Sequence, residues 1–375
     1  MDTIKKIVVG IGKEAKDSRV SMLPEAGAQV VKLGATVWIE TGAGEGSFAH
    51  DDLYAKQGAE IRSRADVIGS ADILLSIHPL NQTEIAQMKA GAVYVSSFQP
   101  FASEQILKVL SEARLTALSL DMIPRITAAQ SMDVLSSMAS IAGYKAAVVA
   151  AAHLPRYFPM LTTAAGSIQP ARVLVLGAGV AGLQAIATAK RLGALVEAFD
   201  TRLAVRQEVE SLGARFVEVP GARDDKAAGG YAVEQTEEYK QRQRQMIQER
   251  ATKSDVIITT ALLRGKRAPL LVTADTVRAM RPGSVIVDLA SASGGNCELT
   301  RSGETIVVNG VTIIGADDLA ATVPVHASQL YGRNVLNYLK LFLKNGACQI
   351  NLQDDILGPS CVVWQGEIRY GKKSA

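Results

Sequence analysis

Short runs of aliphatic and β-branched residues alternate with helical patterns along the first third of the chain. The runs predicted as strands are residues 7–9, 36–39, 73–75, 93–95 and 116–118. The segments predicted as helices are residues 24–33, 82–90 and 103–113. Strand–helix alternation is typical of a mostly parallel, doubly wound sheet with helices on its faces. This region of the chain therefore predicts an α/β domain.

The same alternation returns from residue 172 onward. The runs predicted as strands there are residues 173–176, 196–199, 216–219, 256–259, 285–289 and 311–314. Residues 219–230 combine proline, glycine and charge with little apolar surface and predict a long loop, and residues 234–253 predict a very polar helix. A second doubly wound sheet is therefore expected.

The segment between the two series, residues 128–155, has a single glycine and no proline before its last residue, and it predicts one long connecting helix. We therefore expect two doubly wound, Rossmann-like α/β domains joined by a long helix. The N-terminal domain is expected to comprise residues 1–127 plus about 326–375, because a helix that begins near residue 326 is expected to return to it. The second domain is expected over residues 165–325.

Composition limits the class of protein. The chain has 375 residues, of which 48% are apolar and 21% charged, which is typical of a globular protein. The net charge is +3, from 40 Lys and Arg against 37 Asp and Glu, so no nucleic-acid partner is expected. The three cysteines have no CxxC spacing, so neither a disulfide framework nor a metal site is expected.

The distribution of apolar residues also bears on location. No uncharged apolar stretch of about 18 residues appears, so we expect no segment that inserts into a membrane by itself. The N-terminus lacks the apolar region of a signal peptide. A cytoplasmic protein is therefore expected.

The strongest chemical signal is the run Gly177-Ala178-Gly179-Val180-Ala181-Gly182, which follows an apolar strand and opens a helix. In such a run Gly177 allows a tight turn, Gly179 lets the backbone approach a pyrophosphate, and Gly182 lets the helix pack close to the sheet. The helix N-terminus adds unpaired N–H groups for the phosphates. The run therefore predicts a dinucleotide site, and a glycine-rich turn without a ligand is the alternative.

An acidic residue after the next strand decides which dinucleotide is expected. Asp200 lies 18 residues after Gly182, where a carboxylate can accept hydrogen bonds from an adenosine ribose. It would repel a 2′-phosphate, so NAD(H) is favoured over NADP(H). Arg202 is the counter-argument, because an arginine can bind that phosphate. Residues 165–325 are therefore predicted as an NAD-binding Rossmann domain.

Short polar residues recur on one face of the predicted connecting helix. They have spacings of 3, 4, 3 and 4 and are Gln130, Asp133, Ser137, Ser140 and Tyr144. A solvated face is one interpretation. Because none is Lys or Glu and the helix joins two domains, a polar cleft wall is the other. The amide of Gln130 and the guanidinium of Arg125 are suitable partners for a carboxamide such as that of nicotinamide.

A pair of glycines, Gly229 and Gly230, precedes Tyr231 between the charged loop and the polar helix. Two glycines permit hinge motion, and Tyr231 could then cover a flat ligand, so a lid is one interpretation. An exposed turn is the other.

The residues closely resemble the NAD(H)-binding module, domain I, of the alpha subunit of proton-translocating nicotinamide nucleotide transhydrogenase. The resemblance covers nearly the whole chain. The segments that carry it include AQSMDVLSS at residues 129–137, VAGLQAIATAKRLGA at 180–194, GGYA at 229–232, TTAL at 259–262 and GGNC at 294–297.

The resemblance implies roles for individual residues. Arg125, Gln130 and Asp133, with Ser136 near them, match the group that holds the dihydronicotinamide. The residues that match the other nucleotide contacts, including the mobile loop that closes on the nucleotide, are Gly177, Ala178, Gly179, Val180, Gly182, Asp200, Thr201, Arg202, Gly230, Tyr231, Thr260 and Leu262.

The resemblance also implies an activity. In this family, hydride passes directly between NAD(H) on this module and NADP(H) on a partner module, and membrane subunits couple the transfer to proton translocation. The chain is then one subunit of a split enzyme, active only with its partners. It is expected to be a homodimer held at the cytoplasmic face of the inner membrane by those partners.

Two other functions remain open. A relative with the same architecture, alanine dehydrogenase, needs an anion clamp and an acid–base group. Arg19 matches its substrate arginine, but residues 73–78 contain no matching lysine, residues 95–99 no catalytic histidine, and Ala292 stands near its catalytic aspartate. His78 is the nearest candidate for an acid–base group. A non-catalytic NAD(H) sensor is the third possibility. Residues 98–102 depart from the family pattern.

Overall fold

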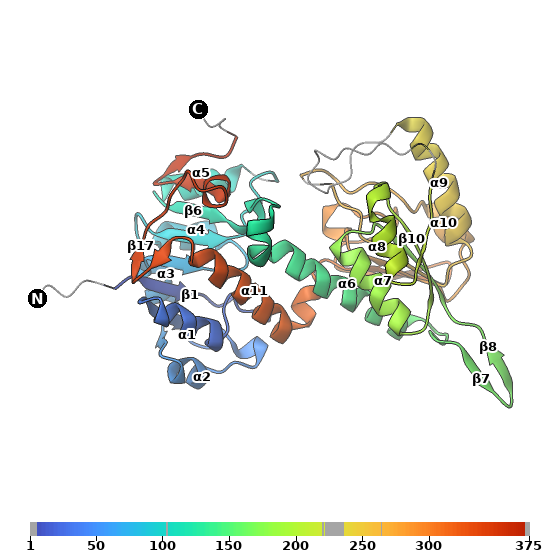
Figure 1. Cartoon of the computed structure of the whole chain (residues 1–375), viewed down its shortest axis with the longest axis horizontal. Helices are drawn as coiled ribbons and strands as arrows, with labels where there is room; N and C mark the ends of the chain where they lie inside the picture. The colour runs from blue at the N-terminus through green and yellow to red at the C-terminus, as the bar shows by residue number, and fades with distance from the viewer. Residues whose placement is uncertain (1–5, 103, 220, 222–235, 264, 372–375) are drawn as a thin grey trace, which may run out of the picture. The chain divides into compact units, whose positions relative to one another are not determined.

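The computed structural model (Figure 1) describes residues 6–371 except 103, 220, 222–235 and 264. The chain divides into two compact units. Unit 1 comprises Met1–Met138 and Ala321–Ala375, and unit 2 comprises Ala139–Ala320. Each unit has its own sheet with helices packed on it and its own buried clusters of apolar side chains. The expected α/β fold with two doubly wound sheets is confirmed.

The sheet of unit 1 has the strand order β19-β18-β6-β5-β4-β1-β2-β3. Its strands are β1 Val8–Ile11, β2 Thr36–Glu40, β3 Glu60–Arg62, β4 Ile73–Leu75, β5 Val93–Ser96, β6 Thr116–Ser119, β18 Cys361–Trp364 and β19 Glu367–Ile368. Strands β1 to β6 are parallel, and β18 runs antiparallel to β6. The chain builds outward from β1 to β3 and then resumes on the other side of β1 with β4. The direction of winding therefore reverses between β1 and β4.

The helices of unit 1 cover both faces of this sheet, because separate apolar clusters lie on the two sides. They are α1 Pro24–Lys32, α2 Asp51–Lys56, α3 Arg64–Ser70, α4 Gln82–Gln87, α5 Gln105–Glu112, α11 Pro324–Leu339 and α12 Leu357–Ser360. A small ribbon follows α11 and consists of β16 Leu343–Lys344 and β17 Ala347–Cys348.

The sheet of unit 2 has the order β11-β10-β9-β12-β13-β15-β14. Its strands are β9 Arg172–Leu176, β10 Leu195–Phe199, β11 Arg215–Phe216, β12 Val256–Thr259, β13 Val285–Asp288, β14 Thr305–Val308 and β15 Val311–Gly315. All neighbours are parallel except β14 and β15. The winding reverses between β9 and β12. In open α/β sheets, ligands bind beyond the carboxyl ends of the strands at such a reversal.

The described helices of unit 2 are α7 Val180–Arg191, α8 Arg206–Ser211, α9 Glu237–Ala251 and α10 Ala274–Ala279. The polar helix expected over residues 234–253 is α9. It is anchored by Tyr239, Ile247 and Ala251, which are buried in an apolar cluster of unit 2. Its other residues are mostly exposed charged and amide side chains, so the helix lies at the surface.

The connecting helix differs from the prediction. The sequence predicts one helix over residues 128–155, but the structure has a 3-10 helix, η3, over Thr127–Met132 and a separate helix, α6, over Val134–His153. Asp133 lies between them and its carboxylate caps α6. A side chain that bonds to the backbone three residues later favours a helix start over a continuous helix. The polar stripe is therefore divided between two elements.

Helix α6 is also, among the described residues, the one helix long and apolar enough to cross a membrane by length and composition alone. The sequence expectation of no membrane segment did not recognise it, because Lys145 interrupts the apolar run. Its residues Ala146, Ala147 and Ala150 are buried in the core of unit 2. A core helix passes the same composition test, and we interpret α6 as a core helix.

The segment after α6, outside the strands expected from the sequence, contains a hairpin. It consists of β7 Leu161–Thr163 and β8 Gly166–Ile168 and projects from the rest of unit 2 (Figure 1). Tyr157, Met160 and Ile168 on and beside it are 54%, 64% and 43% exposed. An isolated two-stranded hairpin is marginally stable in water. The hairpin therefore presents apolar side chains that have no cover within the described residues of this chain.

Candidate functional site

The glycine run lies where the winding of unit 2 reverses. Gly177 has a φ of +102°, and its N–H donates to the carbonyl of Phe199. A Cβ on Gly177 would lie 2.6 Å from Oγ1 of Thr260, and a Cβ on Gly182 would lie 1.9 Å from the carbonyl oxygen of Gly177. Both positions therefore require glycine, for the reasons that the sequence predicts.

Gly179 differs from the other two glycines, because its missing side chain leaves open space. A Cβ there would meet only Nη2 of Arg202, at 3.9 Å. Gly179 precedes α7, whose first residue Val180 is 41% exposed, and no described side chain caps this N-terminus. Free backbone N–H groups beside an open glycine form a cradle for phosphate groups. The turn therefore fits the pyrophosphate of a dinucleotide.

Asp200 lies at the carboxyl end of β10 and is 8% exposed. Its Oδ2 accepts the N–H of Ala178 at 2.8 Å, and its Oδ1 accepts the N–H of Arg202 at 2.8 Å. The guanidinium of Arg202 donates to both oxygens, at 2.9 and 2.8 Å. Thr201 lies between them and is half-buried. Asp200 therefore holds the glycine run, and Arg202 is directed at a carboxylate.

The loop after β12 forms the other side of the reversal. Oγ1 of Thr260 donates to the carbonyl of Gly177 at 3.0 Å, which joins this loop to the glycine run. Leu262 is 47% exposed. Asn296 holds the loop in place, because its amide accepts the N–H of Ala261 at 3.0 Å and donates to the carbonyl of Ala261 at 2.9 Å.

A fully buried carboxylate, Asp288, supports this loop from the end of β13. It accepts hydrogen bonds from the hydroxyls of Thr259 and Thr300 and from the N–H groups of Ala290, Asn296 and Cys297. The sequence analysis assigns no role to Asp288 or Asn296. A carboxylate so placed fixes the segment that carries Asn296, and so fixes the loop that Asn296 holds.

The residues predicted to hold the nicotinamide lie in unit 1, around the joint between η3 and α6. Arg125 and Gln130 are exposed. Asp133 accepts the N–H of Ser136 at 2.9 Å and its hydroxyl at 2.6 Å, so these two predicted residues contact each other. Gly230 and Tyr231 lie outside the described residues.

Helix α11 supports the same joint through a residue that the sequence analysis did not identify. Asn334 is 8% exposed and accepts the hydroxyl of Ser137 at 2.7 Å. Its amide also donates to the carbonyl of Ser131 at 2.8 Å. Asn334 therefore connects η3 to α6 on either side of Asp133. Its partners lie about 200 residues away in sequence, so no local pattern indicates this role.

Arg19, which matches the substrate arginine of alanine dehydrogenase, already binds a carboxylate of its own chain. It is 3% exposed, and its Nε contacts both carboxylate oxygens of Asp17, at 3.0 and 2.9 Å. Nε2 of His78 lies 2.9 Å from the same carboxylate. Burial alone would raise the pKa of Asp17, but the hydrogen bonds from His78 and Arg19 outweigh it and lower that pKa. The arginine is therefore not set up as a substrate clamp.

The same contact raises the pKa of His78, because the hydrogen bond to Asp17 favours the charged ring. Asp17→Asn is expected to lower that pKa toward 6.5. In the native chain, the stability that this pairing contributes is fully present below pH 6.5 and is lost as the pH rises through the raised pKa of His78. NMR titration of the His78 ring measures the shift. Asp66→Asn, at an exposed position of unit 1, should leave it unchanged, and an unchanged value in Asp17→Asn would contradict the expectation.

Comparison with family models gives two matches. Residues 10–142 match the model described as Alanine dehydrogenase/PNT, N-terminal domain. Residues 146–371 match the model described as Alanine dehydrogenase/PNT, C-terminal domain. Together the two matches span most of the chain, including both winding reversals.

Curated proteins similar to this chain carry two names. The chain is 41% identical over 377 residues to the first segment of the divided NAD(P) transhydrogenase subunit alpha of Rhodospirillum rubrum, with 97% of each chain covered. It is 42% identical over 366 residues to NAD(P) transhydrogenase subunit alpha of Haemophilus influenzae, with 96% of this chain and 71% of that protein covered. Identity to alanine dehydrogenase of Mycolicibacterium smegmatis is 31% over 301 residues, with 79% and 75% covered.

Solved structures give the same order of similarity. A transhydrogenase from Sinorhizobium meliloti superposes with a TM-score of 0.89 at 39% identity and covers 96% of this chain and 100% of its own. An L-alanine dehydrogenase superposes with a TM-score of 0.80 at 27% identity, with 97% of each chain covered.

Proposed function

The chain belongs to the alanine dehydrogenase/PNT family, among its NAD(P) transhydrogenase alpha subunits, and from this premise we propose that it binds NAD(H) and exchanges hydride with NADP(H) held by a partner subunit. The observation that carries the proposal is the open backbone at Gly179 between two glycines that tolerate no side chain. NAD(H), when bound, supplies the nicotinamide that gives or accepts the hydride.

In this proposal unit 2 binds the adenosine and pyrophosphate portion of the nucleotide. The first-turn N–H groups of α7 and the open face of Gly179 receive the phosphates. Asp200 accepts the ribose hydroxyls, and Arg202 shifts from its present bonds to make room for them. Thr260 and Leu262 line the path toward the ring.

In unit 1, the joint between η3 and α6 positions the nicotinamide. Gln130 and Arg125 offer an amide and a guanidinium to its carboxamide. Asp133 and Ser136 fix the first turn of α6 and so keep the ring contacts in place. Gly230 and Tyr231 act as a loop that covers the nucleotide and excludes water.

Direct exchange of hydride between two nicotinamides releases no proton, so the chain needs positioning groups and no general base. Arg19 bound to Asp17 is consistent with this, and it weighs against a dehydrogenase that must clamp a substrate carboxylate. The membrane subunits that accompany this chain couple the transfer to proton translocation. They hold it at the cytoplasmic face of the inner membrane.

We expect NADH to bind at least about a hundredfold more tightly than NADPH, because like charges placed together cost several kcal/mol. The 2′-phosphate would meet the carboxylate of Asp200. Titration of the two reduced nucleotides by fluorescence measures the ratio, and equal affinities would contradict the role of Asp200. Glu197→Gln, on the same strand, should leave the ratio unchanged, whereas Asp200→Asn should reduce it.

The chain acts as a homodimer in this proposal, and the β7–β8 hairpin supplies some of the contact. The exposed Met160 and Ile168 are its most accessible apolar residues beside Tyr157. Changing Met160 and Ile168 together to Asp is expected to shift the dimer toward monomer in sedimentation velocity, while Thr163→Asp on the same hairpin should not. A dimer unaffected by the double change would place the contact elsewhere.

Reconstitution tests the proposed activity. Membranes of the source organism stripped of this chain should regain NADPH-driven reduction of an oxidised NAD analogue when the purified chain is added. A chain that binds NADH but restores nothing would contradict the proposal. In that case, reduction of 2-oxo acids in the presence of ammonia would be tested for a dehydrogenase, and NADH binding with neither activity would favour a sensor.

A further inference from the structure

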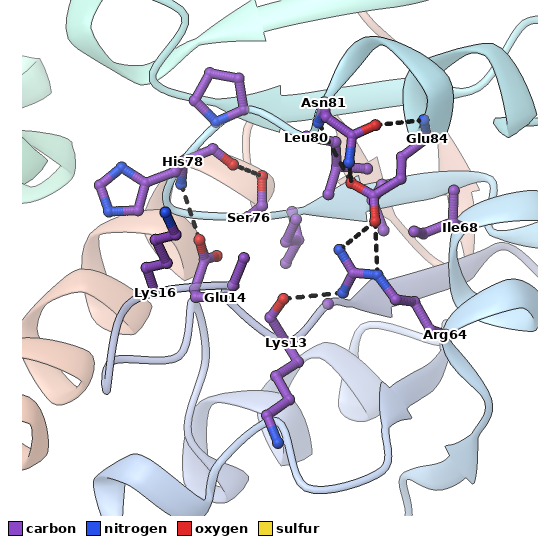
Figure 2. Close-up of a pocket in the computed structure, with 15 residues that line it drawn as sticks. Lys13, Glu14, Lys16, Arg64, Ile68, Ser76, His78, Leu80, Asn81 and Glu84 are labelled. Carbon is purple, nitrogen blue, oxygen red and sulfur yellow. Dashed lines mark hydrogen bonds and ion pairs between the residues drawn. The ribbon is translucent and has the colours of Figure 1, made fainter.

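Unit 1 has a winding reversal of its own, between β1 and β4, and a cavity of about 450 Å³ lies at the carboxyl ends of these two strands. It is lined by the segment that follows β1, by the segment that follows β4, and by side chains of α3 and α4 (Figure 2). Ligands of open α/β sheets bind at such a reversal. The transfer of hydride makes no use of this second reversal.

A buried acid holds the two segments of this cavity together. Glu14 is 8% exposed, and its carboxylate accepts the N–H of Ile77 at 2.6 Å and that of His78 at 3.2 Å. Behind it, Ser76 bonds to the hydroxyl of Tyr94 at 2.8 Å and donates to the carbonyl of His78 at 2.7 Å. The cavity wall is therefore fixed by buried hydrogen bonds and does not depend on exposed side chains alone.

The charges around the cavity favour an anion with one negative charge. Lys13, Lys16 and His78 lie on the side of Glu14, and Arg64 lies across from them beside Glu84 (Figure 2). Arg64 is bound to Glu84 at 2.7 Å and to a further carboxylate, so it adds little free charge.

Two shifts in pKa make this lining more positive. Burial raises the pKa of Glu14, and the bond to Asp17 raises that of His78. The remaining carboxylates still oppose a doubly charged ligand such as phosphate.

The rest of the wall is apolar, with Ile68, Leu74, Leu75 and Leu80 among its lining residues. We propose that this cavity binds a small monocarboxylate with an apolar body, whose carboxylate lies at Lys16 and whose body packs on Leu80. Arg19 is not among the lining residues, so the site is separate from the arginine that matches the alanine dehydrogenase substrate clamp. The proposal goes beyond hydride transfer and does not depend on it.

Ligand-observed NMR on the full chain tests the site with hexanoate, hexan-1-ol and inorganic phosphate as probes. Saturable binding of hexanoate, with hexan-1-ol and phosphate binding at least about tenfold more weakly, is the expected result, because a hydrogen bond to a charged group is worth about 1.5–3 kcal/mol. Equal binding of hexan-1-ol would show that charge has no role, and tighter binding of phosphate would overturn the carboxylate assignment. No saturable binding of hexanoate would overturn the site itself.

Three variants locate the binding. Lys16→Gln should weaken hexanoate about tenfold, whereas Lys108→Gln, at an exposed position on α5, should not change it. Leu80→Trp fills the apolar side and should weaken hexanoate and hexan-1-ol alike. NADH binding by each variant shows that the chain is folded. Hexanoate binding unchanged by both Lys16→Gln and Leu80→Trp would place the ligand elsewhere and overturn the proposal.

Discussion

Replacing Gly182 with alanine is expected to lower the free energy of unfolding by about 3 kcal/mol or more and to abolish NADH binding. The new Cβ would lie 1.9 Å from the carbonyl oxygen of Gly177. That oxygen belongs to the backbone and also accepts a hydrogen bond from Thr260, so it cannot move without opening the loop after β12. Thermal unfolding and NADH fluorescence titration measure the two effects.

Gly179→Ala is the matched control, because the two glycines lie three residues apart in one turn. Its Cβ meets only the end of a flexible side chain, at 3.9 Å, so the unfolding temperature should stay close to that of the native chain. NADH affinity should still fall by more than about tenfold, because the methyl group occupies the space that the pyrophosphate needs. Equal loss of stability in both variants, or NADH binding unchanged in Gly179→Ala, would contradict the assignment of the turn.

Gln130→Asn is expected to slow hydride transfer about a hundredfold while changing NADH affinity by less than about threefold. The shorter side chain keeps the amide but withdraws it by one methylene, and displacement of about 1 Å at a reacting group costs about that much in rate. Most of the nucleotide would still be bound by the turn in unit 2. Single-turnover transfer in the reconstituted enzyme and NADH titration of the isolated chain separate the two quantities.

Gln29→Asn provides the control for this change, because Gln29 is exposed on α1 of the same unit. It should alter neither rate nor affinity. A large loss of NADH affinity in Gln130→Asn with an unchanged transfer rate would show that Gln130 anchors the nucleotide and does not position the ring.

Much of the fold could be predicted from sequence because parallel strands buried on both faces are continuous apolar runs. The runs at residues 73–75, 93–95, 256–259 and 285–289 all correspond to strands of the structure. Strand β3 could not be found in this way, because Glu60 and Arg62 are exposed at the edge of the sheet and leave no apolar run. The β7–β8 hairpin was missed for a similar reason, since its residues are mostly exposed.

The division between η3 and α6 was not predicted, because residues 127–153 are all compatible with helix and the break depends on one side chain. Asp133 bonds to Ser136 and begins a new helix there. Asn334, from α11, then holds the two elements together. Local patterns carry no information on such a contact from a distant region of the chain.

The glycine turn could be predicted, since each glycine serves a backbone requirement that is local in sequence. Its supports could not. Asp288 and Asn296 act through hydrogen bonds to loops up to 35 residues away, and neither stands in a pattern that indicates its role. The pairing of Arg19 with Asp17 is local in sequence, yet the sequence does not show that the arginine is buried on that carboxylate.

The central claim is that this chain supplies the NAD(H) side of a direct hydride exchange. The most direct test supplies reconstituted membranes with NADPH deuterated at the transferred position of the nicotinamide and with an oxidised NAD analogue. The account predicts that deuterium appears in the reduced analogue and that none of the transferred hydrogen comes from solvent. Reduced analogue that carries hydrogen from solvent, or restored activity when Gly179→Ala fails to bind NADH, would contradict it.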